Sequence, residues 1–473
     1  MKFTVKKVLL LMLLGALLYL LLGAILPFTA HPEVSEETRR AVAETAYTGS
    51  EQGTERARII ADNGEALTRR LQMISQAKER IILSTFDIRS DESGKDVLAA
   101  LIAAADRGVE VKLVVDGFCG FTRMTGDPYF VTLSARKNAE IKIYNPVNPL
   151  KPWTLMARLH DKYLIVDNTA YLLGGRNTHD YFLGDHDGKQ NYDWDVLVWQ
   201  EEDRSDSSLH QLLDYFAKVW DSPACHLYHD DVQELEKKRV VEAQAELASR
   251  LLEKQEAHPD WFAPMNYRHL TLPTRQVRLV SNPIHTGAKE PTAFYTITEL
   301  MARGEESVVF HTPYMICNGW MMERLEKVCQ QVPEVTMMTN SVANNGNPCG
   351  AMDYRLHKGE ILETGTKVLE YDGGISYHGK CFTVDDHLAV VGSFNWDMRS
   401  AYIDTELMVV MDSPEVTEAL RREMSRYADA ALTVVDEDTS IAPEGHTPQQ
   451  MGTMKRFVSN VLGLVADWAR FLM

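Results

Sequence analysis

Cysteine is scarce in this sequence, and its spacing argues against the common cysteine-based sites. The 473 residues include six cysteines, with no Cys-x2-Cys pair and no histidine at zinc-ligand spacing. A zinc site is therefore not expected, and the sequence predicts neither a metal nor another cofactor. The six are Cys119, Cys225, Cys317, Cys329, Cys349 and Cys381. In a chain of this size we interpret them as isolated buried thiols.

Positive charge is also in deficit. Lysine and arginine together number 49, whereas aspartate and glutamate number 67, and the net charge is -18. Proteins that bind nucleic acid place lysine and arginine against the phosphates. Nucleic acid is therefore not an expected partner. The rest of the composition, 45% hydrophobic and 25% charged, is that of an ordinary globular protein.

Only one uncharged apolar run is long enough to cross a membrane. It extends from Val8 to Phe28, and at ~1.5 Å per residue it covers a hydrocarbon core of ~30 Å. A cleaved signal peptide is the alternative, but the run exceeds a usual signal-peptide core and Phe28 is bulky where a small residue is needed. Lysines before the run and glutamates after it favour a cytoplasmic N-terminus. We predict an anchor at residues 1–30, with the rest of the chain outside the cytoplasm.

Short apolar strands alternate with helices in two series along the rest of the chain. The predicted strands begin at Arg80, Val109, Glu140, Ser307, Val335 and Thr366. This order predicts the α/β class, with two similar sandwich units whose mixed, largely parallel sheets are flanked by helices. We place the first unit at 76–200 and the second at 276–413. The other predicted segments are a tether and entry helix at 31–75, a helical connector at 201–275, and C-terminal helices at 414–473.

The end of the chain, residues 454–473, has apolar residues at three-and-four spacing. This pattern predicts an amphipathic helix. The helix could dock on the protein core or on a second subunit, or it could lie in a membrane interface with Trp468 at the level of the headgroups. The sequence leaves this choice and the oligomeric state open.

One motif occurs twice, and each copy follows one of the strand series. Its pattern is His-x-Lys-x4-Asp-x6-Gly-Gly/Ser-x-Asn. The first copy comprises His160, Lys162, Asp167 and Asn177, and the second His378, Lys380, Asp385 and Asn395. Five chemically distinct positions at identical spacing are hard to reach by chance. We therefore interpret the two copies as one composite site formed where the two units meet.

The residue types in this motif suit a phosphate group. Residues i and i+2 of a strand share a face, so each histidine lies beside a lysine. The lysines would stabilise the phosphate charge without a metal, and the side chains of Asn177 and Asn395 could donate hydrogen bonds to the same oxygens. One imidazole would attack phosphorus to form a phosphohistidine. The other would protonate the leaving alkoxide and later deprotonate the acceptor.

Four acidic residues are candidates for supporting roles. Asp195 and Glu406 each stand directly before an apolar strand, and we predict that they orient the two imidazoles. Asp167 and Asp385 complete the motif and are included in the catalytic set. We interpret these two as supports for the lysines or for the turn that follows.

The double motif is identified as that of the phospholipase D superfamily, and the surrounding residues resemble bacterial cardiolipin synthases. The matching segments are Arg107-Gly108-Val109-Glu110-Val111, Tyr144-Asn145-Pro146, Gly174-Gly175-Arg176-Asn177, Thr312-Pro313-Tyr314, Thr339-Asn340-Ser341 and Gly392-Ser393-Phe394-Asn395. Two features differ from the better-known synthases. The chain has one predicted membrane helix instead of two, and His311 stands where a small polar residue is more usual.

The resemblance implies phosphatidyl transfer at a bacterial cell membrane. Phosphatidylglycerol would donate its phosphatidyl group to a histidine, and the glycerol hydroxyl of a second lipid would accept it. By analogy with the superfamily, we assign His160 as the nucleophile and His378 as the acid/base, and the near-symmetry of the two copies leaves the reverse assignment open. The implied partners are phospholipid substrates and the membrane.

Three alternatives remain open from the sequence. Water could be the acceptor, and the enzyme would then be a hydrolase that releases phosphatidic acid, because acceptor choice depends on how the site excludes water. A nuclease of the same superfamily is disfavoured by the anchor and the acidic charge. A scaffold without activity is disfavoured because both copies of the motif are complete.

Overall fold

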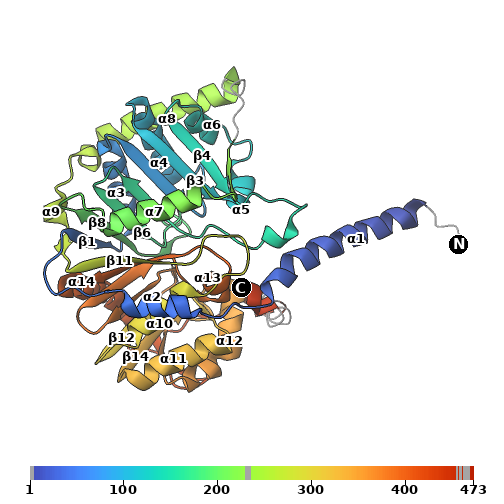
Figure 1. The fold of residues 1–473 in the computed structure, drawn as a ribbon, viewed down its shortest axis with the longest axis vertical. Coiled ribbons are helices and arrows are strands. Elements are labelled where there is room, and N and C mark those ends of the chain that lie inside the picture. Colours follow the sequence, from blue (N-terminus) through green and yellow to red (C-terminus); the bar gives the residue numbers. More distant parts are fainter. Residues whose placement is uncertain (1–4, 229–235, 454–455, 458–460, 462–468) are drawn as a thin grey trace.

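Two α/β units form the body of the protein, and one long helix projects from it (Figure 1). The structure is a computed structural model, and it describes residues 5–228, 236–453, 456–457, 461 and 469–473. Each unit is built on one nine-stranded sheet. The predicted pair of similar α/β units is therefore confirmed.

The first sheet combines strands from three of the predicted segments, the tether, the first unit and the connector. In spatial order they are β10 (Leu272–Pro273), β1 (Glu55–Ile60), β8 (Asp195–Gln200), β6 (Ala170–Gly174), β5 (Tyr163–Val166), β2 (Arg80–Thr85), β3 (Glu110–Asp116), β4 (Ala139–Tyr144) and β9 (Cys225–Leu227). Only the pairs β2 with β3 and β3 with β4 are parallel. The six other neighbouring pairs are antiparallel.

The second sheet repeats this arrangement. Its order is β11 (Gln276–Ser281), β20 (Leu407–Asp412), β18 (Leu388–Gly392), β17 (Cys381–Val384), β12 (Ser307–His311), β14 (Glu334–Asn340), β15 (Lys367–Tyr371), β21 (Ala431–Val434) and β22 (Ser440–Ile441). Its parallel pairs are again two, β12 with β14 and β14 with β15. The sheets are mixed as predicted, but the prediction that they are largely parallel is wrong, because the motif strands return as hairpins.

The two sheets pack face to face with helices on their outer sides. Buried residues of β6, β8, β18 and β20 share one apolar cluster with α7 (Ser208–Trp220) and α14 (Pro414–Ser425). The outer side of the first sheet packs against α3 (Asn63–Gln76), α4 (Glu92–Asp106) and α6 (Pro128–Ser134), and α8 (Lys238–Ala257) packs on α4 and α6. The outer side of the second packs against α10 (Thr292–Met301), α11 (Gly319–Gln331) and α12 (Pro348–Glu363). The contact between sheets brings the two motif hairpins together.

Local sequence explains where these helices begin and end. The side chain of Asp91 accepts a hydrogen bond from the backbone of Gly94 at 3.1 Å and caps the start of α4. Gly108, at φ 95°, lies just past its end.

Several segments that the sequence predicted to be helical or linking contribute strands instead. β1 belongs to the predicted tether, β9 and β10 to the predicted connector, and β21 and β22 to the predicted C-terminal helices. These strands are short or lie toward the sheet edges. They therefore lack the long apolar runs by which buried strands are recognised.

The apolar N-terminal run is helical. α1 extends from Val5 to Ile25, and η1 (Leu26–Phe28) continues it. Within the described residues this is the one segment long and apolar enough to cross a membrane. α2 (Glu36–Glu44) then packs on the second unit. The amphipathic helix predicted at 454–473 lies mostly outside the described residues.

Candidate active site

The backbones of the two motif histidines are each held by the opposite unit. The amide of His160 donates to Oγ1 of Thr405 at 3.1 Å. The amide of His378 donates to the carbonyl of Tyr192 at 2.7 Å, where β7 (Asn191–Tyr192) pairs with β16 (Ser376–Tyr377). The predicted composite site therefore lies at the junction of the units, with parts of each motif anchored across it.

The imidazoles are also paired with carboxylates across this junction. Nδ1 of His160 lies 2.8 Å from Oε1 of Glu406. Nδ1 of His378 lies 2.6 Å from Oδ2 of Asp193. Each unit thus supplies the acid for the histidine of the other. The Nε2 atoms carry the lone pair or proton available to a substrate.

The prediction that Asp195 orients one of the imidazoles is wrong. Its carboxylate lies 2.8 Å from Arg70 and 3.4 Å from Arg176, and it is fully buried. Register explains the error. Asp195 lies opposite Gly174 in the first sheet, and the equivalent glycine, Gly392, lies opposite Met408. Asp193, two residues earlier, is therefore the counterpart of Glu406.

The two lysines lie beside their histidines in a buried environment. Lys162 and Lys380 are 2% and 1% exposed. Each Nζ donates to the carbonyl oxygen of its own histidine, and Lys380 is also 3.6 Å from Asp193. Burial lowers the pKa of Lys162 to about 8 and also lowers the pKa of Lys380. Both can deliver positive charge at short range to an anionic group.

The two acid–histidine pairs differ in their electrostatics. Burial raises the pKa of Glu406 to about 8, and the nearby Lys162 only partly opposes this shift. Burial acts in the same direction on Asp193, but Lys380 and His378 outweigh it and hold the pKa of Asp193 below its usual value. Burial lowers the pKa of His378 to about 4 and that of His160 well below its usual value. His378 therefore faces a carboxylate that stays ionised, and His160 faces one that favours its proton.

The two asparagines of the motif are buried near the histidines' hairpins. Oδ1 of Asn177 accepts from the amide of Asp87 at 3.2 Å. Nδ2 of Asn395 lies 3.3 Å from the hydroxyl of Tyr314. Among the described residues no protein group pairs with Oδ1 of Asn395. The predicted contact of Asn177 and Asn395 with phosphate stays a prediction.

Asp167 and Asp385 lie away from the histidines, so their inclusion in the catalytic set is wrong. Oδ1 of Asp167 accepts from the amides of Glu79 and Arg80 at 2.8 and 3.0 Å. Asp385 binds the amides of residues 305–307 in the same way. Both have positive φ, 53° and 46°, which aspartate tolerates at a turn. Of the two interpretations made from the sequence, support of the turn fits these contacts.

Sequence reasoning missed a buried chain of polar groups behind His378. Nε1 of Trp194 donates to the hydroxyl of Tyr377, and that hydroxyl lies 2.9 Å from Nδ1 of His311. Burial lowers the pKa of His311 to about 3, so its ring is neutral and can accept there. A Cβ at Gly379 would lie 2.3 Å from the indole of Trp194. The middle residue of the second His-x-Lys is therefore glycine because Trp194 occupies the space.

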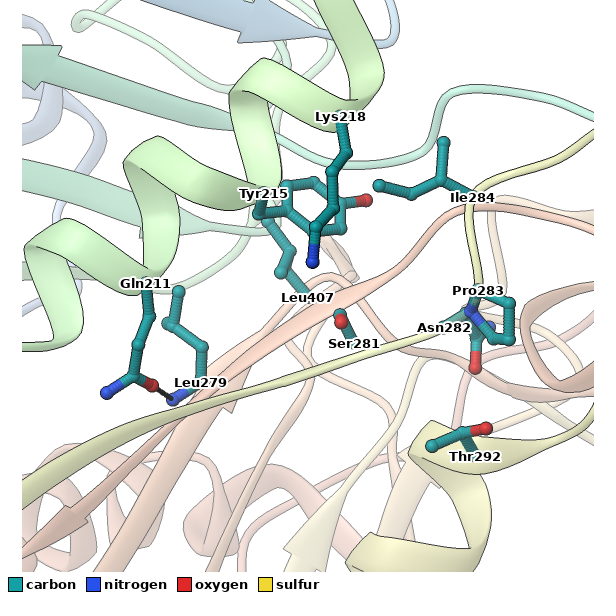
Figure 2. Close-up of a pocket in the computed structure, with 10 residues that line it drawn as sticks. All are labelled: Gln211, Tyr215, Lys218, Leu279, Ser281, Asn282, Pro283, Ile284, Thr292 and Leu407. Atoms are coloured by element: carbon teal, nitrogen blue, oxygen red, sulfur yellow. Dashed lines mark hydrogen bonds between the residues drawn. The ribbon is translucent and has the colours of Figure 1, made fainter. Parts of the chain in front are cut away.

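A cavity of about 530 Å³ lies between α7 and β11 (Figure 2). Its lining includes Tyr215, Lys218 and Leu407 but neither motif histidine. The hydroxyl of Tyr215 donates to Oδ2 of Asp161, the residue after His160, at 2.9 Å. The cavity therefore lies behind the first motif and is not the position at which a substrate would meet the two imidazoles.

Comparison with known proteins identifies a matching family. A family described as "Cardiolipin synthase, PLD-like domain" matches residues 71–220 and 297–428, one match in each unit. Cardiolipin synthase C of Escherichia coli is 25% identical over 411 residues, covering 78% of this chain and 84% of that protein. Cardiolipin synthase B of the same organism is 24% identical, covering 80% and 82%. An uncharacterized protein of Helicobacter pylori is 24% identical, covering 80% of each chain.

The fold also resembles that of a solved structure. The phosphatidylserine synthase of Haemophilus influenzae superposes with a TM-score of 0.65 at 13% identity, covering 93% of this chain and 99% of that one. The duplicated α/β fold and the paired His-Lys motifs define a protein of the phospholipase D superfamily. Within it, the chain belongs to the cardiolipin synthase, PLD-like domain family.

Proposed function

We propose that the protein is a membrane-anchored phosphatidyltransferase that makes cardiolipin from phosphatidylglycerol. The observation that carries the proposal is the pairing of His160 with Glu406 and of His378 with Asp193 at the junction of the units. Two imidazoles and two lysines around one phosphoryl group fit a double displacement. The names of the bacterial relatives support a phospholipid substrate.

In the first step, Nε2 of His160 attacks phosphorus and the bond from phosphorus to the leaving glycerol oxygen breaks. His378 gives its Nε2 proton to that oxygen, and free glycerol departs. In the second step, the hydroxyl of another phosphatidylglycerol gives its proton to His378 and attacks phosphorus. The N–P bond then breaks and His160 is regenerated.

The opposite pKa shifts of Glu406 and Asp193 support the assignment of His160 as nucleophile and His378 as acid. A nucleophile must be neutral, and the pKa of His160 lies well below its usual value while Glu406 favours its proton. An acid must hold a proton, and the ionised Asp193 is the group that favours a protonated imidazole at His378, against the burial that lowers the pKa of His378 to about 4. Lys162 and Lys380 would bind the non-bridging oxygens, and Asn177 and Asn395 would line the same phosphate.

The test is mass spectrometry of lipids after incubation of the purified, detergent-solubilised protein with phosphatidylglycerol. Cardiolipin and glycerol are expected, and His160→Ala or His378→Ala should abolish both. Cardiolipin only after phosphatidylethanolamine is added would identify a mixed-donor enzyme. Phosphatidic acid alone would show that water is the acceptor, and cardiolipin formation unaffected by either substitution would overturn the proposal.

A further inference from the structure

The loop that leads into His160 is fixed against the apolar helix α1. The hydroxyl of Tyr19 donates to the carbonyl of Leu150 at 2.9 Å. Gly23 packs so tightly on Pro152 that a Cβ at position 23 would lie 2.4 Å from the proline ring. Phe28, at the end of η1, is 1% exposed in the core of the second unit. The loop at 145–157 therefore holds a defined position along the last turns of α1 (Figure 1).

Four large apolar side chains are exposed on this side of the body. Leu150 and Trp153, on the loop, are 79% and 47% exposed. Phe118 and Phe121, on α5 (Gly117–Cys119) and η2 (Gly120–Met124), are 54% and 61% exposed. A Cβ at Gly117 would lie 2.0 Å from the carbonyl oxygen of Asn145, so α5 packs directly on the start of the loop. We name these four side chains the apolar rim.

The backbone of the loop is suited to an environment without water. Pro146, Pro149 and Pro152 have no amide hydrogen. The amides of Leu150 and Lys151 donate to Asn148 at 3.0 and 2.9 Å. The carbonyl of Leu150 accepts from Tyr19, as described above. Unpaired backbone amides and carbonyls are costly in hydrocarbon. In this loop the prolines have no amide hydrogen, and the other groups named above are paired within the protein.

We propose that the apolar rim inserts into the lipid bilayer beside α1, as a second membrane contact. Tyr19 precedes Phe28, the end of the apolar span, by nine residues, which is ~13 Å of helix. Because Phe28 itself is buried in the body, Tyr19 and its partner Leu150 lie where α1 leaves the body and meets the acyl chains. Two cations lie among the rim residues, Lys151 and the half-exposed Arg123, which is also 3.8 Å from Asp87. Long side chains at such positions can reach phosphate headgroups.

This insertion extends the proposed function. The loop continues through residue 157 to His160, so a lipid whose acyl chains lie against the apolar rim would carry its phosphate toward the motif histidines. The side-chain amide of Asn145 also ties the two ends of the loop together by donating to the carbonyl of Ala157 at 2.8 Å. A substrate could thus reach the site without leaving the bilayer.

Photolabelling tests the insertion without requiring turnover. The full-length protein is reconstituted in phosphatidylglycerol–phosphatidylcholine vesicles that contain a phospholipid with a diazirine in its acyl chain. Adducts are expected on α1 and on peptides that contain Leu150, Trp153, Phe118 and Phe121. Leu252 and Ile441, which are 61% and 60% exposed on α8 and β22, should remain unlabelled. Adducts confined to α1 would overturn the proposal.

A double variant, Leu150→Glu with Trp153→Glu, gives the second measurement, with Leu252→Glu as its matched control. The double variant should lose the acyl adducts on the loop. Its turnover of long-chain phosphatidylglycerol in vesicles should fall about tenfold, with turnover of a monomeric short-chain analogue unchanged.

Labelling without any turnover would support the insertion and count against the proposed function. A change from dimer to monomer without acyl labelling would show that a second copy covers the rim.

Discussion

Nδ1 of His160 lies 2.8 Å from Oε1 of Glu406, a residue 246 positions later in the chain and in the other unit. The reciprocal pair, His378 with Asp193, spans 185 positions. Neither unit therefore contains a complete acid–histidine pair of its own. The site exists only when the two sheets are packed together, which makes the junction part of the candidate active site.

Asp193 and Asp195 provide a matched test of the assignment made from the structure. Asp193→Asn should lower kcat by about 10²–10⁴-fold, because the amide no longer stabilises the imidazolium of His378. Its melting temperature should change little. Asp195→Asn leaves Arg70 and Arg176 without their buried carboxylate, and it should destabilise the protein by about 3–5 kcal/mol. Its kcat per folded molecule should be retained.

Kinetics with phosphatidylglycerol and thermal unfolding measure the two effects separately. The opposite pattern, with loss of turnover in Asp195→Asn and an active Asp193→Asn, would contradict the cross-unit pairing.

Glu406 should give the stability a specific pH dependence. Its pKa is raised from 4.5 to about 8 by burial, so the folded protein keeps a proton that the unfolded chain has released. The resulting stabilisation is present in full below about pH 4.5 and is lost as the pH rises through about 8. The lowered pKa values of His160 and His378 act in the opposite direction, but only below their unfolded value of 6.5.

The window for the measurement is therefore pH 6.5 to 8. Across it, the stability of the wild type relative to Glu406→Gln should fall by up to about 1.4 kcal/mol per pH unit. Chemical denaturation of both proteins at several pH values measures this difference. Parallel stability curves would show that Glu406 is ionised throughout the window.

Asp385 should contribute to folding and not to chemistry. Asp385→Ala removes the acceptor for the amides of residues 305–307 and places alanine at a φ of 46°. We expect a loss of about 1–3 kcal/mol in stability. Asp385→Asn keeps an acceptor oxygen and tolerates this φ, so it should lose less. Both variants should retain the wild-type kcat when assayed well below their melting temperatures. A thousandfold loss in either one would return Asp385 to the catalytic set.

The sequence predicted most of the candidate site, because the motif is local and repeated. His160 with Lys162, and His378 with Lys380, are placed side by side by the two-residue period of a strand. The acid partner could not be located in the same way. Asp193 and Asp195 both precede the same apolar strand, and only the register with Gly174 distinguishes them.

The fold was predictable to a similar degree. The long apolar run and the buried strands have strong patterns, whereas peripheral strands such as β1 and β21 do not. Strand direction was the larger error. The sequence shows alternation of strands and helices, but most neighbouring strands of the first sheet are antiparallel, among them the hairpin of β5 with β6. The pairing between units depends on packing of the two sheets, which no local pattern encodes.

Tyr377 should position His378 through its buried hydroxyl. Tyr377→Phe leaves Nε1 of Trp194 and Nδ1 of His311 without their shared partner, which should cost about 1–3 kcal/mol. Tyr171→Phe is the matched control, because its hydroxyl is also buried and bonds Ser208 at 2.7 Å. Both variants should lose stability, but only Tyr377→Phe should also lower kcat, by about tenfold, because the next residue is His378. A KM unchanged in both variants would place the effect on chemistry, and equal kcat values would show that the Tyr377 hydroxyl serves stability alone.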